Sequence, residues 1–247
     1  MHPRENDCDV TKGNASHRNA EALRRERIAQ ALFPEVAQTY TVMINDEPIE
    51  PHSPLEAELV AKSIPKRRRE FFAGRHCARQ ALAKIGVDTD FIGRRADRAP
   101  IWPPNTIGSI AHNEDFCCAV ASKITNIVSL GIDVESAATL PVNVQPLICA
   151  PDEIMSFRRL PCPEKADWVT IAFSAKEAFY KCYYMLVGSP LDFYEVFLSF
   201  KIQTEVSGEF RVRLLKSAES HQNVATRVFG RWAVDSETVY CGAHILP

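Results

Sequence analysis

The chain has 247 residues, which is enough to bury a sizeable core in one large domain or two small ones. Hydrophobic residues make up 46% of it and charged residues 24%, and the net charge is −2, a composition typical of a soluble globular protein. No apolar run approaches the length needed to cross a bilayer and the polar N-terminus lacks a signal-like apolar core, so we expect a cytoplasmic protein without a transmembrane segment.

The spacing of the cysteines and the distribution of charge indicate which kinds of site the chain can form. The eight cysteines form no C-x-x-C pair, so we expect buried or free thiols rather than disulfides or zinc ligands. Between Lys62 and Arg98 eleven Lys and Arg residues stand against four acidic ones, whereas acids outnumber bases from Lys123 onward. A basic patch in the first half and a carboxylate cluster in the second suit a polyanionic ligand that reaches the carboxylates through a metal ion.

The first half is predicted to begin with an unstructured segment, residues 1–19. Apolar periodicity, alternation and the positions of proline and glycine then predict the following elements. They are a helix over 21–33, a strand over 37–44, a short helix over 55–64, a long helix over 65–85, a basic loop over 93–104, and two strands within 106–122 joined by a turn at 113–115.

The second half is predicted to be richer in strands. It begins with a β-branched strand over 127–135, and three helices follow over 141–150, 151–160 and 167–187. Alternation then predicts four strands, over 195–202, 210–215, 224–234 and 238–245.

Two carboxylates share one side of the strand that ends in Gly131-Ile132-Asp133-Val134-Glu135. Side chains alternate along a strand, so Asp133 and Glu135 point the same way. Magnesium and manganese ions prefer such oxygen ligands. A D-x-E pair at a strand end is also a common polar boundary, so the pair alone does not establish a metal site.

The helix over 167–187 contains a second polar group, in the stretch FSAKEAFYK. We expect Ser174 to cap a helix on which Glu177 and Lys181 lie four residues apart and meet on one side. Lys176 points about 100° away from Glu177 on an ideal helix, so Lys181 is the better partner for the carboxylates. A Glu and Lys pair at this spacing is otherwise often a solvated surface pair.

Together, GIDVE and FSAKEAFYK resemble the two-part signature of the 4′-phosphopantetheinyl transferases, G-[IV]-D-x-E followed by [FWL]-[ST]-x-K-E-[AS]-x-x-K. These enzymes move the phosphopantetheine arm of coenzyme A onto a serine of a carrier protein. The stretch KRRREFFAGRHCARQAL is similar to the siderophore-associated and mycobacterial-type subgroup. The resemblance implies an α+β fold of two similar halves related by a pseudo-two-fold axis, with the active site at the seam.

The resemblance also implies roles for particular residues. Coenzyme A contacts are implied for Arg67, Arg75, Arg98, Ala99, Pro100, Ala111, His112, Asp133, Glu177 and Lys181. The register of Arg67 among three consecutive arginines stays open. Metal ligands are implied at Asp133, Glu135 and Glu177 for Mg²⁺ or Mn²⁺, and catalytic roles at Glu177, Lys181 and Glu135. The base that accepts the serine proton is Glu177, directly or through water, or Glu135.

We therefore expect residues 20–125 to bear most coenzyme A contacts and residues 126–247 the metal and catalytic motifs. The expected partners are coenzyme A and apo acyl or peptidyl carrier proteins, with no nucleic acid, and we expect a monomer. Asn105 replaces a glycine that is usual in the loop after Trp102-Pro103, and asparagine tolerates the positive φ required there. Two alternatives are a metal-dependent phosphodiesterase or nuclease and a non-catalytic coenzyme A-binding module.

Overall fold

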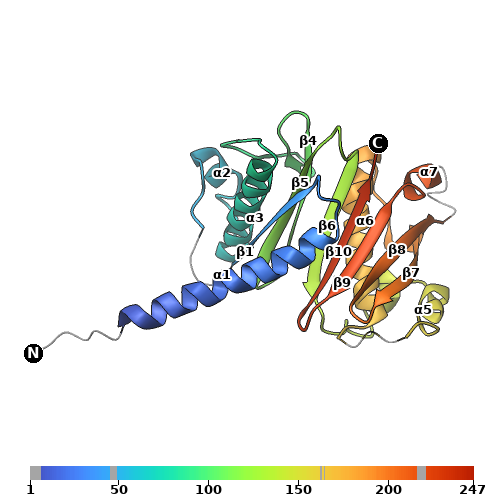
Figure 1. Cartoon of the computed structure of the whole chain (residues 1–247). Coiled ribbons are helices and arrows are strands. Elements are labelled where there is room, and N and C mark those ends of the chain that lie inside the picture. Colours follow the sequence, from blue (N-terminus) through green and yellow to red (C-terminus); the bar gives the residue numbers. More distant parts are fainter. Residues whose placement is uncertain (1–6, 45–48, 162, 164, 216–220) are drawn as a thin grey trace, which may run out of the picture.

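The computed structural model describes residues 7–44, 49–161, 163, 165–215 and 221–247, and side chains from residue 18 onward. It is an α+β structure in which a long helix packs against an antiparallel sheet in each half (Figure 1). No helix among these residues is both long and apolar enough to cross a membrane.

The N-terminal half is built around α3 (Pro65–Lys84), which packs against the sheet β1-β5-β4. Pro65 occupies the first turn of α3, where its missing N–H costs nothing, and Gly86 follows the helix at φ 75°. The other elements of this half are α1 (Asp7–Ala31), β1 (Gln38–Met43), α2 (Pro54–Leu59), β2 (Gly93–Arg94), β3 (Pro100–Ile101), β4 (Thr106–His112) and β5 (Phe116–Lys123).

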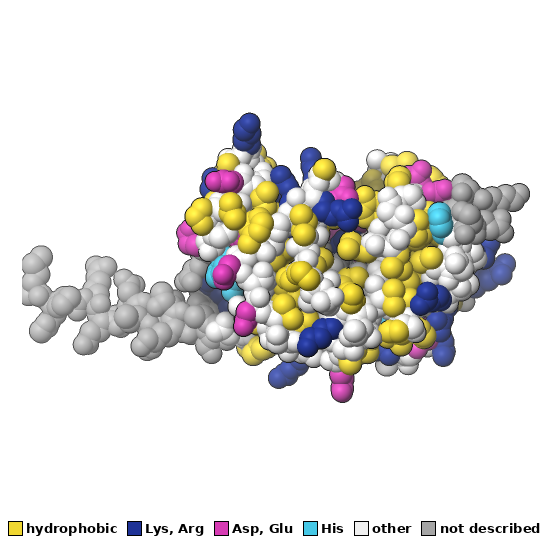
Figure 2. Space-filling view, turned by 90° about the horizontal axis from the view of Figure 1, so that it is seen from above, with side chains coloured by type: hydrophobic (Ala, Val, Ile, Leu, Met, Phe, Trp, Pro, Cys, Tyr) yellow, Lys and Arg dark blue, Asp and Glu magenta, His cyan; other side chains and the backbone are white. Residues whose placement is uncertain are grey.

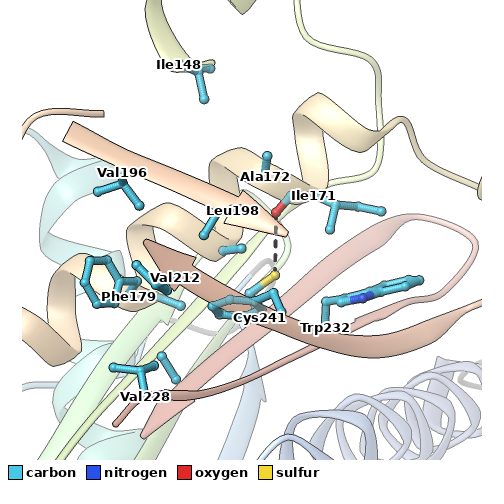
Figure 3. Close-up of a cluster of buried hydrophobic side chains, with 14 of the residues drawn as sticks. Ile148, Ile171, Ala172, Phe179, Val196, Leu198, Val212, Val228, Trp232 and Cys241 are labelled. Carbon is cyan, nitrogen blue, oxygen red and sulfur yellow. Dashed lines mark hydrogen bonds between the residues drawn. The ribbon is translucent and has the colours of Figure 1, made fainter. Parts of the chain in front are cut away.

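The C-terminal half is built around α6 (Trp168–Val187), which packs against the five-stranded sheet β6-β10-β9-β8-β7. Apolar side chains from α6 and the sheet fill the space between them, and the Cys241 thiol lies 3.7 Å from the Ile171 carbonyl oxygen (Figure 3). The other elements are β6 (Ser129–Ser136), α4 (Gln145–Ile148), α5 (Pro151–Phe157), η1 (Phe193–Glu195), β7 (Val196–Thr204), β8 (Ser207–Leu214), α7 (Gln222–Ala225), β9 (Phe229–Val234) and β10 (Thr238–Ile245).

The two halves meet where β4 lies beside β6. The Ile132 backbone N–H donates to the Ser109 hydroxyl oxygen across this seam, at 3.1 Å. A buried Arg25 from α1 donates to the hydroxyls of Thr238 and Tyr240 and lies over the Phe116 ring. One hydrophobic cluster contains residues of both halves, so the halves share a core at the seam.

Several sequence predictions hold in the structure. The helix over 65–85 and the strands within 106–122 are present, and Asn113 builds the connecting turn by accepting the backbone N–H groups of Asp115 and Phe116. Asn105 has φ 60°, the positive value expected of a residue that replaces glycine. Six cysteines are buried free thiols, at positions 77, 117, 118, 149, 182 and 241, while Cys8 and Cys162 lie outside the residues whose side chains are described.

Three predictions are corrected. Helix α1 begins at Asp7, so residues 7–19 are helical rather than unstructured, because a polar segment without proline can extend a helix; residues 1–6 lie outside the described residues. Ser174 is buried inside α6 and does not cap it: the apolar turn from Trp168 already packs in the core, and Asp167 accepts the N–H groups of Val169 and Thr170. The strand predicted over 224–234 begins only at Phe229, since 222–225 form the helical turn α7.

Gly131 fixes the distance between β6 and α6. A Cβ atom built on Gly131 would lie 2.1 Å from the Ala178 carbonyl oxygen and 2.8 Å from the Cys182 backbone nitrogen. Both are backbone atoms of α6 and cannot rotate away. The glycine of the GIDVE stretch is therefore required for close packing of the strand against the helix.

We expect Gly131→Ala to lower the free energy of unfolding by about 1–3 kcal/mol, since the added methyl group must push β6 and α6 apart. The matched control is Gly93→Ala, whose Cβ would first meet the Ile101 side chain at 3.3 Å. Urea denaturation followed by circular dichroism gives both values. Equal stability of the two variants would show that α6 yields easily at this contact.

Candidate active site

An acidic and a basic side chain of the two motifs meet between β6 and α6. The Lys181 ammonium group donates to Asp133 Oδ1 at 2.7 Å and to the Ile132 carbonyl oxygen at 3.0 Å. The Asp133 side chain is only 7% exposed, whereas that of Lys181 is 29% exposed. The helix face predicted from spacing is thus the one that reaches the strand.

Glu135 and Glu177 lie in the electrostatic field of Asp133. Burial raises the pKa of Glu135 to about 7, and the charges of Asp133 and Glu177 add to this rise while Lys181 opposes it. Burial, and secondly the charge of Asp133, also raise the pKa of Glu177. Three carboxyl groups crowded around one ammonium group carry more negative charge than the lysine can neutralise.

The donor set fits a hard divalent cation. Asp133 Oδ2 is buried and has no hydrogen-bond partner in the described part of the chain, which leaves an oxygen available for an ion. The three predicted ligands are carboxylates, the ligand type that Mg²⁺ and Mn²⁺ prefer. Among the described residues, no three His, Cys, Asp or Glu side chains already stand close enough to enclose an ion, so an ion would bind there only with side-chain rotation.

A hollow of about 380 Å³ opens beside this group, between the two halves. Seven of the ten residues predicted to contact coenzyme A line it: Arg67, Arg75, Arg98, Ala99, Pro100, His112 and Lys181. Helix α6 adds Tyr180, Tyr184 and Met185 to the opposite wall. Asp133 and Glu177 do not line it, and Ala111 is 3% exposed and packs in the core at the seam.

Arg67 lies at the mouth of the hollow and meets His112. Its Nη1 atom is 3.1 Å from His112 Nε2, and a guanidinium group can only donate, so this imidazole nitrogen accepts. Burial, followed by the charges of Arg67 and Lys181, lowers the pKa of His112 against the opposing effect of Glu70. The ring is therefore neutral, with its proton on Nδ1, and Nε2 can donate to a ligand only after a change of protonation or tautomer.

The sequence did not identify Glu70 as a site residue. Its carboxylate accepts from Arg67 Nη1 at 3.3 Å and lies 3.8 Å from His112 Nε2, with only 13% of the side chain exposed. It also lines a second hollow of about 340 Å³, which contains Glu135 and shares His112 with the first. The spacing of three residues between Arg67 and Glu70 on α3 is the signal that could have revealed it.

Arg75 lines the hollow but is largely engaged with the protein itself. It is 5% exposed, donates to the carbonyl oxygens of Ile92 and Gly93 at 2.9 and 3.0 Å, and lies over the Phe71 ring. Burial lowers its pKa to about 10. Arg75 therefore supports the segment that leads into the loop around Arg98.

Lys176 faces away from the carboxylates. It is 1% exposed and donates to Glu153 at 2.7 Å, and to the carbonyl oxygens of Ile148 and Phe193. Glu153 in turn accepts the Leu198 backbone N–H. The two lysines of the helix motif thus have different surroundings: Lys176 joins α6 to α5, α4 and η1, and Lys181 joins it to β6.

We expect Lys176→Met to lower the free energy of unfolding by about 3–5 kcal/mol, because it leaves the Glu153 carboxylate buried without its cation. The matched variant Lys181→Met also leaves a carboxylate, Asp133, without its cation, but Lys181 is 29% exposed and water reaches that pair, so this variant should cost less. Chemical denaturation measures both. A Lys176→Met protein as stable as Lys181→Met would show that Glu153 loses its charge without cost.

We also expect Glu135 to make stability depend on pH. Its folded-state pKa of about 7 exceeds the ordinary value of 4.5, so the folded protein holds the proton more tightly. The stability that this proton contributes is complete below pH 4.5 and is lost as the pH rises through 7.

The glutamine in Glu135→Gln cannot ionise. The free energy of unfolding of this variant should therefore exceed that of the unmodified protein by an amount that grows between about pH 5 and 8, to on the order of 3 kcal/mol. Unfolding in urea with a chelator present, at several pH values, gives this difference. A difference independent of pH would show that Glu135 titrates normally.

Comparison with known proteins places the chain in one family. Residues 55–122 match the 4′-phosphopantetheinyl transferase N-terminal domain, and residues 129–235 match the 4′-phosphopantetheinyl transferase superfamily model. These two segments contain the larger hollow and the Asp133–Lys181 pair.

Curated proteins named as 4′-phosphopantetheinyl transferases are similar to this chain over most of their length. The chain is 32% identical to 4′-phosphopantetheinyl transferase Npt of Nocardia iowensis, over 83% of this chain and 94% of that protein. It is 34% identical to PptT of Mycobacterium tuberculosis, over 79% and 87%, and 36% identical to Svp of Streptomyces mobaraensis, over 75% of each. The predicted transferase activity and α+β fold are thereby confirmed against the phosphodiesterase and binding-module alternatives, and the chain belongs to the 4′-phosphopantetheinyl transferase superfamily.

Proposed function

We propose that the larger hollow holds coenzyme A while the enzyme transfers its 4′-phosphopantetheine group to a serine of an apo acyl or peptidyl carrier protein. The contact between Lys181 and Asp133 carries this assignment. Lys181 lines the hollow, and the lysine and aspartate meet at 2.7 Å, so the catalytic group and the ligand cavity are adjacent. One copy of the chain supplies both walls, which supports a monomeric enzyme.

The basic side chains of the hollow suit the phosphates of coenzyme A. Arg67 is half-exposed and Arg98 is exposed, so both can turn toward a ligand, and His112 lies beside Arg67. Arginine binds phosphate oxygens through paired N–H groups. We propose that Arg67, Arg98 and His112 hold the nucleotide end and that Arg75 supports the wall behind it.

Asp133, Glu135 and Glu177 are the proposed ligands of a magnesium or manganese ion. The unpartnered Asp133 oxygen and the raised pKa values of both glutamates support this assignment, because a bound cation would relieve their mutual repulsion. When bound, the ion supplies charge neutralisation on the pyrophosphate and its leaving group. Lys181 adds a fixed positive charge from the protein.

The reaction is a displacement at the β-phosphorus of coenzyme A. The serine oxygen forms a bond to that phosphorus, the bond to the bridging pyrophosphate oxygen breaks, and adenosine 3′,5′-bisphosphate leaves. The serine proton passes to a carboxylate, for which we propose Glu177, directly or through water, or Glu135. In the metal-free protein the raised pKa of each brings its proton affinity closer to neutral pH, which favours these two carboxylates as proton acceptors.

The start of α3 is the proposed region of electrostatic encounter with the carrier. Lys66, Arg67, Arg68 and Arg69 are exposed there, next to the mouth of the hollow. Figure 2 shows Lys and Arg side chains standing among hydrophobic ones on the face seen from above. Carrier proteins of this type are acidic, so this surface should accelerate their association at low salt.

We expect Asp133→Ala and Glu177→Ala to abolish transfer while leaving the fold largely intact, because each removes a proposed metal ligand. Lys181→Ala should lose transfer much more severely than Lys176→Ala among the molecules that remain folded. The measurement is the mass of an apo carrier protein after incubation with coenzyme A, Mg²⁺ and each variant. Normal turnover by Asp133→Ala or Glu177→Ala would end the assignment of the metal site.

A panel of apo carriers from fatty-acid, polyketide and nonribosomal peptide systems identifies the preferred partner in the same assay. The active protein should add one phosphopantetheine mass to its carrier and release adenosine 3′,5′-bisphosphate. Replacing the carrier serine with alanine is the control and should remove both products.

A further inference from the structure

A hydrogen bond joins the two walls of the larger hollow. The Tyr184 hydroxyl of α6 donates to Asp97 Oδ2 at 2.8 Å. Asp97 lies in the turn between β2 and β3, so the bond connects the N-terminal half with the C-terminal half across 87 positions of sequence. Both residues line the hollow.

The same carboxylate also shapes its own turn. Asp97 Oδ1 accepts the Ala99 backbone N–H at 3.0 Å, while the Arg95 N–H donates to the Ala99 carbonyl and the Arg98 N–H donates to the Arg95 carbonyl. Side-chain acceptance two residues ahead is the Asx-turn pattern of aspartate. One carboxylate therefore holds both the shape of the turn and its position against α6.

This turn places Arg98 in an unusual backbone conformation. Its φ is 73°, in the left-handed region that residues other than glycine seldom adopt. Such a conformation persists only where surrounding bonds hold it. The Asp97 interactions contribute to those bonds beside the two backbone bonds of the turn, and the residue that they constrain carries a guanidinium group at the wall of the proposed ligand site.

The charge states of the pair favour the bond at neutral pH. The Ala99 N–H, followed by the Tyr184 hydroxyl, lowers the pKa of Asp97, and hydrogen bonding to Asp97 raises the pKa of Tyr184. A phenol donating to a carboxylate is thus the stable arrangement. The Tyr184 ring also packs against the Tyr180 ring, with centroids 5.6 Å apart, which limits its rotation.

We propose that Asp97 and Tyr184 form a latch that fixes the turn carrying Arg98 against α6 and so positions the Arg98 guanidinium for the nucleotide phosphates of coenzyme A. Both are positioning residues, since they act through Arg98. The inference rests on the proposed function only in taking the larger hollow as the coenzyme A site. The latch would preorganise the site, because a turn that is already held in place loses less conformational freedom when coenzyme A binds.

The test measures ligand affinity by isothermal titration calorimetry, without turnover. We expect Tyr184→Phe to weaken coenzyme A binding about 2- to 10-fold, the effect of one lost hydrogen bond. Asp97→Ala should weaken it more, because the turn loses its Asx bond as well. The double variant should bind no more weakly than Asp97→Ala, since both changes remove the same latch.

A conservative variant and the two fragments of coenzyme A distinguish a positioning role from a general loss of structure. Asp97→Asn keeps an oxygen for the Ala99 N–H and gains an amide that can donate to the Tyr184 oxygen, so it should bind better than Asp97→Ala. Adenosine 3′,5′-bisphosphate should show the same losses as coenzyme A, whereas 4′-phosphopantetheine should show none. In turnover, KM for coenzyme A should rise in Tyr184→Phe while kcat is retained.

Arg98→Gly separates failure of the latch from failure of the proposed site. Glycine adopts φ 73° without strain, so this variant removes the guanidinium and keeps the turn. If Arg98→Gly weakens nucleotide binding but Tyr184→Phe and Asp97→Ala do not, the latch is wrong and the coenzyme A site stands. If Arg98→Gly leaves binding unchanged, the role proposed for Arg98 is wrong, and the latch falls with it.

Discussion

The contact between Lys181 and Asp133 is the interaction on which the site depends. A buried aspartate is costly unless a cation compensates it, and Lys181 supplies that cation to β6 from the facing helix. The lysine can reach the strand because Gly131 allows the backbones of β6 and α6 to approach closely. The glycine, the aspartate and the lysine of the two motifs are thus parts of one packing arrangement as well as of one chemical site.

The two lysines of the α6 motif have different structural roles. Lys176 is bound inside the C-terminal half by Glu153 and two carbonyl oxygens, so the helix cannot rotate without breaking a buried ion pair. That restraint fixes the direction of the helix face about 100° away, which carries Glu177, Lys181 and Tyr184. Two lysines five residues apart therefore serve different ends: one holds the orientation of the helix, and the other presents charge to the seam.

The sequence predicted the parts of this arrangement that local spacing determines. Alternation placed Asp133 and Glu135 on one strand face, and helical spacing selected Lys181 over Lys176. It could not predict contacts that only the tertiary fold creates, such as Tyr184 with Asp97 or Arg67 with His112. It also took Ser174 for a cap because serine favours that position, whereas the apolar turn before it extends the helix into the core.

The seam between the halves explains why the site combines rigid and adaptable groups. Beneath it, the Ile132 bond to Ser109 and the shared hydrophobic core hold β4 and β6 together. Above it, the Arg67 side chain is more exposed and meets Glu70 and His112 through hydrogen bonds near solvent. A phosphate ligand can replace such bonds at small cost, because exposed hydrogen bonds exchange readily with water. The buried layer is thus rigid, while the exposed side chains above it are free to adjust to a charged ligand.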